Sequence, residues 1–133
     1  MSLFCKVVHV YLLVCSANAL WDDDTYTASD RSVLVFGGNG FLGSETVSAL
    51  IELGCNVTIV NRGGRYWDAE ERVFSRVRSI ECDREKKLED GCPQLFADPA
   101  TDRYDFVIDF SAKNDKYLND TFKFLQNKVS FVW

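Results

Sequence analysis

The chain has 133 residues, enough for one domain, with 15 Lys and Arg against 20 Asp and Glu and a formal net charge of −5. Its hydrophobic fraction of 47% and charged fraction of 26% exclude a collagen, a coiled coil and a disordered chain. The net acidity argues against nucleic acid as a partner, because binding to nucleic acid depends on Lys and Arg that neutralise phosphates.

Residues 1–19 have the layout of a secretory signal peptide. Lys6 precedes a short apolar run over residues 7–14, and Ala17-Asn18-Ala19 supplies the small residues that a signal peptidase reads. The run is too short for a transmembrane span, which needs about 20 residues. We therefore expect a secreted or secretory-pathway protein; the alternative is an extra buried helix or strand on a cytoplasmic one. Residues 20–30 carry four Asp and indicate an acidic linker.

Residues 31–133 alternate between strand and helix patterns, which predicts parallel pairing and an α/β fold. The runs at 32–36 and 57–60 are apolar and β-branched, as in strands buried on both faces of a sheet. Weaker signals are a helix over 66–77 and an irregular charged stretch over 85–98. The remaining expected elements are helices over 41–53 and 115–127 and strands over 77–82, 104–110 and 129–133.

This pattern predicts a Rossmann-like doubly wound parallel sheet of about five strands, truncated in the fifth. The domain would then be C-terminally incomplete, and the free edge of its last strand could pair with another chain. In the second long helix, one apolar side is expected to face the core, formed by Tyr117, Leu118, Phe122 and Leu125.

The cysteines indicate neither a disulfide framework nor a metal site. Cys5 and Cys15 lie in the leader, which leaves Cys55, Cys82 and Cys92, an odd number without metal-ligand spacing. We expect Cys55 and Cys82 to be small core residues.

The most specific motif is the turn Gly37-Gly38-Asn39-Gly40-Phe41-Leu42-Gly43, which lies between the first strand and the first helix. It satisfies both G-x-G-x-x-G and G-x-x-G-x-x-G. In either pattern, glycines permit a tight turn, a close approach of pyrophosphate to the backbone, and close packing of helix on strand. The helix N-terminus then directs N–H groups at the phosphates. The turn predicts a dinucleotide site.

The end of the second strand indicates which dinucleotide is preferred. NAD sites usually place Asp or Glu there, whereas this strand ends in Asn61-Arg62. A guanidinium can bind a 2′-phosphate through two hydrogen bonds. We therefore expect NADP to be preferred and NAD to be the alternative; Arg62 could also be only a solvated surface residue.

Four segments together resemble the extended and atypical short-chain dehydrogenase/reductases, close to the NAD-dependent epimerase/dehydratase family. They are V-L-V-F-G-G-N-G-F-L-G, T-I-V-N-R-G, C-D-R and Y-D-F-V-I-D-F, and the likeness covers residues 32–133. The resemblance implies a pyrophosphate site at the glycine turn, a ribose or phosphate contact by Arg62, and an adenine contact by Asp83 and Arg84. It also implies that the cofactor ribose is lined by Phe110, Ser111 and Ala112. Taken alone, Asp83 and Arg84 could equally be a solvated charge pair.

The sequence departs from that family in its catalytic residues. Active members use a Tyr-x-x-x-Lys pair for proton transfer, and no Tyr of this chain has Lys four residues later. We therefore expect no catalytic residue here, and a chain that forms the cofactor-binding part of an epimerase/dehydratase-like oxidoreductase. The alternatives are a non-catalytic module that senses NADP and an RNA-associated atypical relative.

Overall fold

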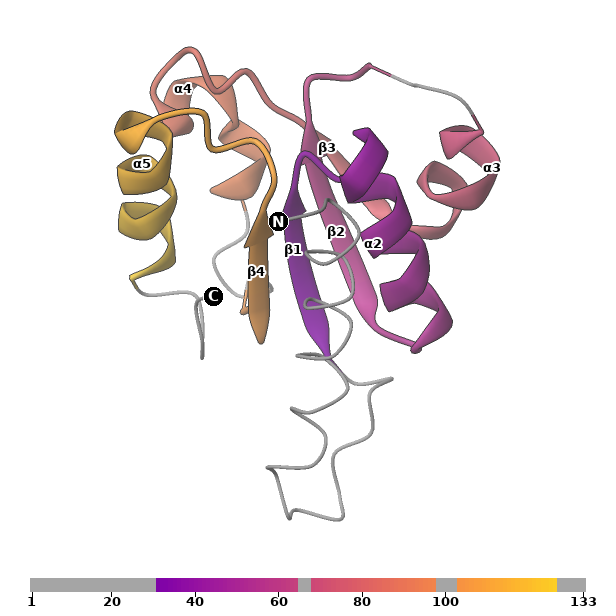
Figure 1. The fold of residues 1–133 in the computed structure, drawn as a ribbon. Helices are drawn as coiled ribbons and strands as arrows, with labels where there is room; N and C mark the ends of the chain where they lie inside the picture. The colour runs from indigo at the N-terminus through magenta and orange to yellow at the C-terminus, as the bar shows by residue number, and fades with distance from the viewer. Residues whose placement is uncertain (1–30, 65–67, 98–102, 127–133) are drawn as a thin grey trace, which may run out of the picture.

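A computed structural model describes residues 31–64, 68–97 and 103–126. The expected signal peptide, acidic linker and fifth strand lie outside these residues. The described part forms a four-stranded sheet of order β3-β2-β1-β4 (Figure 1). Its strands are β1 (Ser32–Phe36), β2 (Asn56–Asn61), β3 (Arg78–Glu81) and β4 (Phe106–Asp109).

All three strand pairs are parallel, so the carboxyl ends of the strands meet at one edge of the sheet. β1 occupies the centre, pairing Val33 with Val57 on one side and with Phe106 on the other. β1 and β4 are sequence-distant neighbours, and this strand order leaves the glycine turn after β1 between the loops that follow β2 and β4. In doubly wound sheets, ligands bind at the point where the strand order reverses.

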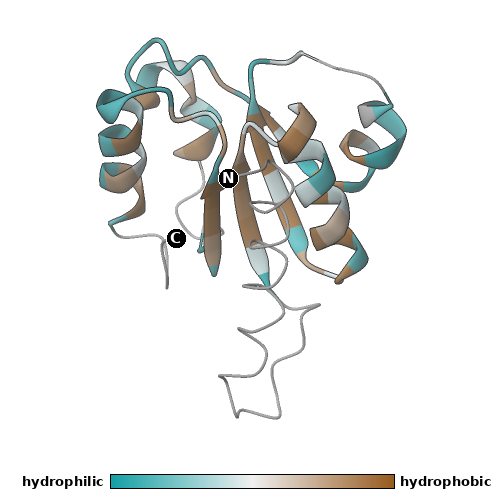
Figure 2. Ribbon diagram, in the orientation of Figure 1, coloured by the Kyte–Doolittle hydropathy of each residue, from teal (hydrophilic) through white to brown (hydrophobic). Residues whose placement is uncertain are grey.

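Helices cover both faces of the sheet, which explains the unbroken apolar runs of β1 and β2 (Figures 1 and 2). Alternate residues of β1 therefore enter two different cores: Val33 and Val35 one, Leu34 and Phe36 the other. The first face carries α2 (Phe41–Glu52), α3 (Ala69–Arg72) and the 3₁₀ turn η2 (Phe74–Arg76). The second carries α4 (Leu88–Gly91), η3 (Pro93–Leu95) and α5 (Asp115–Leu125).

The helix α2 begins and ends where glycines permit it. Gly40 is the N-cap residue, and Gly54, with a φ of 82°, follows the last turn in the left-handed conformation. The Gly54 N–H donates to the Ile51 carbonyl at 2.9 Å. The end of α2 at Glu52 lies one residue before the predicted boundary.

The expected core face of α5 is wrong in part. Tyr117 and Leu125 are buried, but Leu118 and Phe122 are 44% and 46% exposed. The buried stripe is completed instead by Thr121 and Phe124. A search for apolar residues overlooks Thr121. With Tyr117 and Phe124, it completes an i, i+4, i+7 stripe, and this stripe is the buried side of the helix.

The expectation that the cysteines form no disulfide is also wrong, because Cys82 and Cys92 are disulfide-bonded, with their Cα atoms 4.5 Å apart. Residues 83–91 form a compact loop that contains α4, and the Asp83 N–H donates to the Gly91 carbonyl at 2.9 Å. This loop brings the chain back to the end of β3, so Cys92 reaches Cys82. Cys55 remains a half-buried thiol, and burial raises its pKa.

Candidate functional site

A cleft of about 290 Å³ opens at the carboxyl edge of the sheet. Its walls come from the glycine turn, the loop after β2, the end of β3 and the loop between β4 and α5. The lining residues are Gly37, Asn39, Gly40, Val60, Asn61, Arg62, Gly64, Cys82, Arg84, Glu85, Phe110, Ser111, Lys113 and Tyr117.

The glycine turn distinguishes between the two overlapping motifs. Gly37 has a φ of 75° and lines the cleft, as does Gly40. A Cβ at Gly43 would lie only 2.1 Å from the Gly37 carbonyl oxygen, so Gly43 permits the helix to pack on the turn. A Cβ at Gly38 would meet Ile59 at 2.7 Å, which places Gly38 against the sheet rather than in the cleft. The geometry therefore follows G-x-x-G-x-x-G.

The N-terminus of α2 is suited to an anion. Gly40 caps the helix without a side chain, and the first turn contains no acidic residue. A Cβ at Gly40 would make one ordinary contact, with the Gly37 carbonyl oxygen at 3.5 Å, so this backbone is not closely covered. N–H groups in the first turn of a helix have no partner within the helix, and they carry a partial positive charge. These features fit a pyrophosphate.

The loop after β2 is held by asparagines. The Asn39 amide donates to the Gly64 carbonyl, tying this loop to the glycine turn. Asn61 is buried: its Oδ1 accepts from the Gly63 N–H at 2.7 Å, and its Nδ2 lies 3.2 Å from the Ser79 hydroxyl. Arg62 is exposed, lines the cleft, and has no ion pair among the residues that the structure describes.

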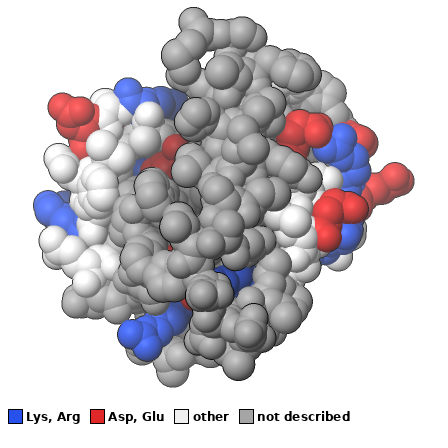
Figure 3. Space-filling model, turned by 60° about the horizontal axis from the view of Figure 1, so that its bottom comes forward, with Lys and Arg blue, Asp and Glu red and all other residues white. Residues whose placement is uncertain are grey.

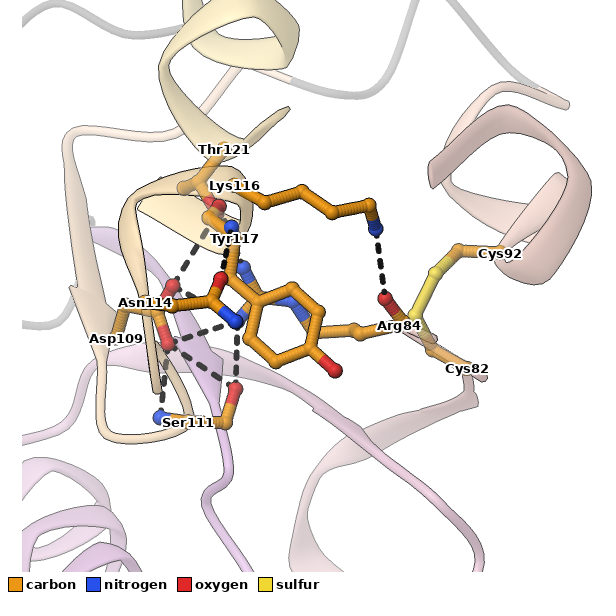
Figure 4. Close-up of polar contacts among 9 residues, drawn as sticks. All are labelled: Cys82, Arg84, Cys92, Asp109, Ser111, Asn114, Lys116, Tyr117 and Thr121. Carbon is orange, nitrogen blue, oxygen red and sulfur yellow. Dashed lines mark hydrogen bonds and ion pairs between the residues drawn. A yellow bond between two sulfur atoms is a disulfide. The ribbon is translucent and has the colours of Figure 1, made fainter. Parts of the chain in front are cut away.

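Arg84 is not half of a solvated charge pair. It is only 8% exposed, and both of its terminal nitrogens are used within the protein (Figure 4). Nη1 lies 2.9 and 2.8 Å from the two carboxylate oxygens of Asp109 and 2.6 Å from the Ser111 hydroxyl. Nη2 donates to the Tyr117 carbonyl at 2.8 Å and to the Thr121 hydroxyl at 2.7 Å. By contrast, Asp83 is half-buried and lies outside the cleft lining.

Aromatic rings enclose the same guanidinium. Its carbon lies 4.8 Å from the centre of the Phe36 ring and 5.0 Å from that of Tyr117. A hydrogen bond to Glu85 raises the pKa of the Tyr117 phenol above its usual range. Glu85 also lies 3.8 Å from the Lys113 ammonium, so these residues link the loops after β3 and β4 along one side of the cleft.

The structure brings only part of the predicted set to the cleft lining. Gly38, Phe41, Leu42, Gly43, Asp83 and Ala112 do not line it; the other eight do. Sequence reasoning missed Val60, Gly64, Cys82, Glu85, Lys113 and Tyr117. For Tyr117 a signal existed, because Asn114 is a good helix N-cap, and its side chain accepts from the Tyr117 N–H. That cap places Tyr117 in the first turn of α5, beside the cleft.

Figure 3 shows charged side chains of both signs among the described residues at the margins of one face. There, the described Lys and Arg side chains are interspersed with Asp and Glu. Within the described residues, no helix is long and apolar enough to cross a membrane.

A parallel sheet with helices on both faces and a glycine turn after its first strand defines a Rossmann-like domain. Among solved structures, the chain is similar in fold to the enzyme WbmF of Bordetella bronchiseptica, in complex with NAD+ and UDP. The TM-score is 0.56 and the sequence identity 22%, over 77% of this chain and 34% of WbmF. No curated protein matches the chain.

The sequence model of the NAD dependent epimerase/dehydratase family matches residues 33–132. The chain therefore belongs to this family, and it spans about a third of the length of WbmF.

Proposed function

We propose that the chain binds a nicotinamide dinucleotide in this cleft, as the cofactor-binding part of an epimerase/dehydratase-like oxidoreductase. The observation that carries the proposal is the glycine turn. Gly37 turns the chain in a left-handed conformation, and Gly40 lines the cleft at the N-terminus of α2 without a side chain. The turn lies at the carboxyl edge of a parallel sheet, where such folds bind ligands.

The proposed pose follows from the cleft walls. The pyrophosphate lies over Gly40 and the first turn of α2, and the adenosine lies toward Arg62 and the end of β3. The ribose is lined by the loop after β4, in which Phe110 and Ser111 face the cleft and Ala112 lies next to them. When bound, the nicotinamide ring supplies hydride transfer, and this part of the chain binds and orients it.

The proposed preference for NADP depends on Arg62. Its guanidinium is exposed at the cleft, and the Asn61 side chain is occupied by Gly63 and Ser79. A 2′-phosphate placed there gains an ion pair, whereas the ribose of NAD gains none from this residue.

Titration calorimetry with NADH and NADPH tests both statements. We expect saturable binding of both and a lower Kd for NADPH, with Arg62→Ala equalising the two affinities. Arg78→Ala, on the exposed part of β3 and outside the cleft, is the matched control and should retain the difference. Absence of binding to either dinucleotide would contradict the proposed function. Equal affinities in the unaltered chain would contradict only the preference.

The proposal also assigns the chain to the secretory pathway. The disulfide between Cys82 and Cys92 supports this, because disulfides form and persist in oxidising compartments. The test is N-terminal sequencing after expression in a secretory host. A mature chain beginning at Leu20 is expected, whereas a cytosolic chain that retains Met1 would refute the assignment.

A further inference from the structure

We propose that Arg84 is a positioning residue, which holds the loop between β4 and α5 in the conformation that the cofactor requires. The inference rests on the proposed function, because it concerns the same cleft. It differs from the role that the family resemblance implies, which is direct contact with adenine.

The loop in question comprises residues 110–114 and forms one wall of the cleft. Phe110, Ser111 and Lys113 line the cleft from this loop. Within the loop itself, few bonds fix its shape. Ser111 is held by Asp109, whose Oδ1 accepts from the Ser111 N–H at 2.8 Å and lies 3.1 Å from the Ser111 hydroxyl. The position of Ser111 therefore depends on where the Asp109 carboxylate lies.

Arg84 fixes that carboxylate from the end of β3. The two side chains form an ion pair of 2.8 Å, with side-chain exposures of only 9% and 10%. A buried carboxylate without its partner is strongly disfavoured, so Asp109 has one stable position as long as Arg84 is present. Arg84 also reaches the Ser111 hydroxyl directly, at 2.6 Å.

The same guanidinium connects the wall to α5. Its second nitrogen donates to the Tyr117 carbonyl and to the Thr121 hydroxyl, and that hydroxyl lies 3.2 Å from Asp109 Oδ2. The Arg84 side chain, which follows β3, thus joins the end of β4 to the first turns of α5 (Figure 4).

The bonding pattern explains why the role is indirect. Both terminal nitrogens are occupied by protein acceptors, and Asp109 neutralises the charge, so little remains with which to bind a phosphate. The planar fork of arginine supplies these bonds in two directions at once, which the single ammonium of lysine cannot reproduce. Without the Arg84 contacts, the loop would adopt the binding-competent conformation for only part of the time. The apparent Kd for the dinucleotide then rises by the inverse of that fraction.

Thr121→Val tests the inference without touching the cleft, because Thr121 is not among the lining residues. The change keeps the shape of the side chain and removes a hydroxyl that contacts both Arg84 and Asp109, while the direct ion pair between those two residues stays in place. We expect Kd for the dinucleotide to rise about fivefold to tenfold, which corresponds to a loop that is competent roughly a tenth to a fifth of the time. The measurement is titration calorimetry well below the melting temperature, on the full chain from a host without N-glycosylation, since Thr121 completes the sequence Asn119-Asp120-Thr121.

Thr46→Val is the matched control. The Thr46 hydroxyl donates to the carbonyl four residues earlier in α2, at 3.0 Å, and the Thr121 hydroxyl makes the equivalent contact in α5 at 2.9 Å. Only Thr121 also contacts Arg84. Thr46→Val should therefore leave Kd within about twofold of the original, since Thr46 does not line the cleft and its hydroxyl bonds within α2 rather than to Arg84.

Chemical rescue separates positioning from general structural support. Arg84→Ala should weaken binding more than Thr121→Val, and millimolar guanidinium chloride should restore part of the lost affinity, whereas ammonium chloride at the same ionic strength should not. Arg62→Ala, an exposed arginine of the same cleft, should show no such rescue if guanidinium acts at the buried Arg84 position.

The outcomes separate this inference from the proposed function. If the unaltered chain binds no dinucleotide, the proposed function fails and this inference fails with it. If the unaltered chain binds but Thr121→Val binds equally well, or if guanidinium restores nothing to a folded Arg84→Ala chain, only the positioning role is overturned.

Discussion

Gly40 and Gly43 belong to the same turn, yet their backbones meet different surroundings. A Cβ at Gly43 would lie 2.1 Å from a backbone oxygen, which no side-chain rotation can relieve. A Cβ at Gly40 would make only an ordinary contact at 3.5 Å, and its φ of −75° suits any residue. We therefore expect Gly40 to serve the proposed cofactor site, whereas Gly43 permits the packing of α2 on the turn.

Alanine substitutions should separate these two roles. We expect Gly43→Ala to lower the free energy of unfolding by about 3 kcal/mol, because the helix must shift from the turn. Gly40→Ala should change it by less than about 1 kcal/mol and instead weaken dinucleotide binding, because the methyl group occupies the pyrophosphate space. Urea denaturation and titration calorimetry measure the two effects. Equal stabilities of the two variants would contradict the assignment.

At the scale of single elements, we expect the disulfide between Cys82 and Cys92 to stabilise the segment between β3 and β4. The bridge closes a loop with a sequence separation of 10 between the two cysteines. Cross-linking a loop of this size stabilises a fold by about 3 kcal/mol through the unfolded state. Both cysteines are buried, and Cys82 lines the cleft two residues before Arg84.

Replacing both Cys82 and Cys92 by Ser should lower the free energy of unfolding by about 2–4 kcal/mol. It should also weaken dinucleotide binding, because the loop carries Arg84 and Glu85. Cys55→Ser is the control, since that thiol is free and lies away from the cleft. Denaturant melts under non-reducing conditions give the stability. A double variant as stable as the control would show that the bridge contributes nothing.

The two faces of α5 make a second test at this scale. Phe124 is 7% exposed and packs edge-on against Phe96, with ring centroids 5.1 Å apart, whereas Phe122 is 46% exposed. Phe124→Ala should destabilise the fold by about 3–5 kcal/mol. Phe122→Ala should change the stability by less than about 1 kcal/mol. Thermal and denaturant melts measure both stabilities. A larger loss for Phe122→Ala than for Phe124→Ala, as the apolar pattern of the sequence predicts, would contradict this expectation.

The elements that sequence reasoning predicted well are those with continuous burial. β1 and β2 are apolar because helices cover both faces of the sheet, and glycines mark the limits of α2. Predictions failed where a contact joins distant residues. Nothing in the ten-residue spacing of Cys82 and Cys92 signals a bridge, and Thr121 is polar in a buried stripe because Arg84 and Asp109 satisfy its hydroxyl. The ion pair between Arg84 and Asp109 could not be predicted either, because the two residues are 25 positions apart in the sequence.

At the scale of the whole molecule, we expect the 133 residues alone to be catalytically silent. The chain contains no Tyr-x-x-x-Lys pair, so no identified group can move the proton of a substrate hydroxyl, a step typically worth about 10²–10⁴-fold in rate. The measurement is the absorbance of NADPH and NADH at saturating cofactor with a panel of nucleotide sugars. Turnover above the uncatalysed rate would contradict this expectation, even where binding is confirmed.

The strand order also has a consequence for how the molecule is made. β1, β2 and β3 leave the ribosome in sequence and can pair with their neighbours at once. β4 pairs with β1 much later, because Asp105, which contacts Ser32 at the start of β1, lies 73 positions further along the chain. Such long-range pairing is the slow step of folding. The cleft wall formed by Phe110, Ser111, Lys113 and Tyr117 follows β4 in the sequence, so this wall is absent until then. A nascent chain halted before β4 should therefore hold the glycine turn without the wall opposite. If the proposed dinucleotide binds across both walls, it can stabilise only a chain in which β4 has already paired with β1.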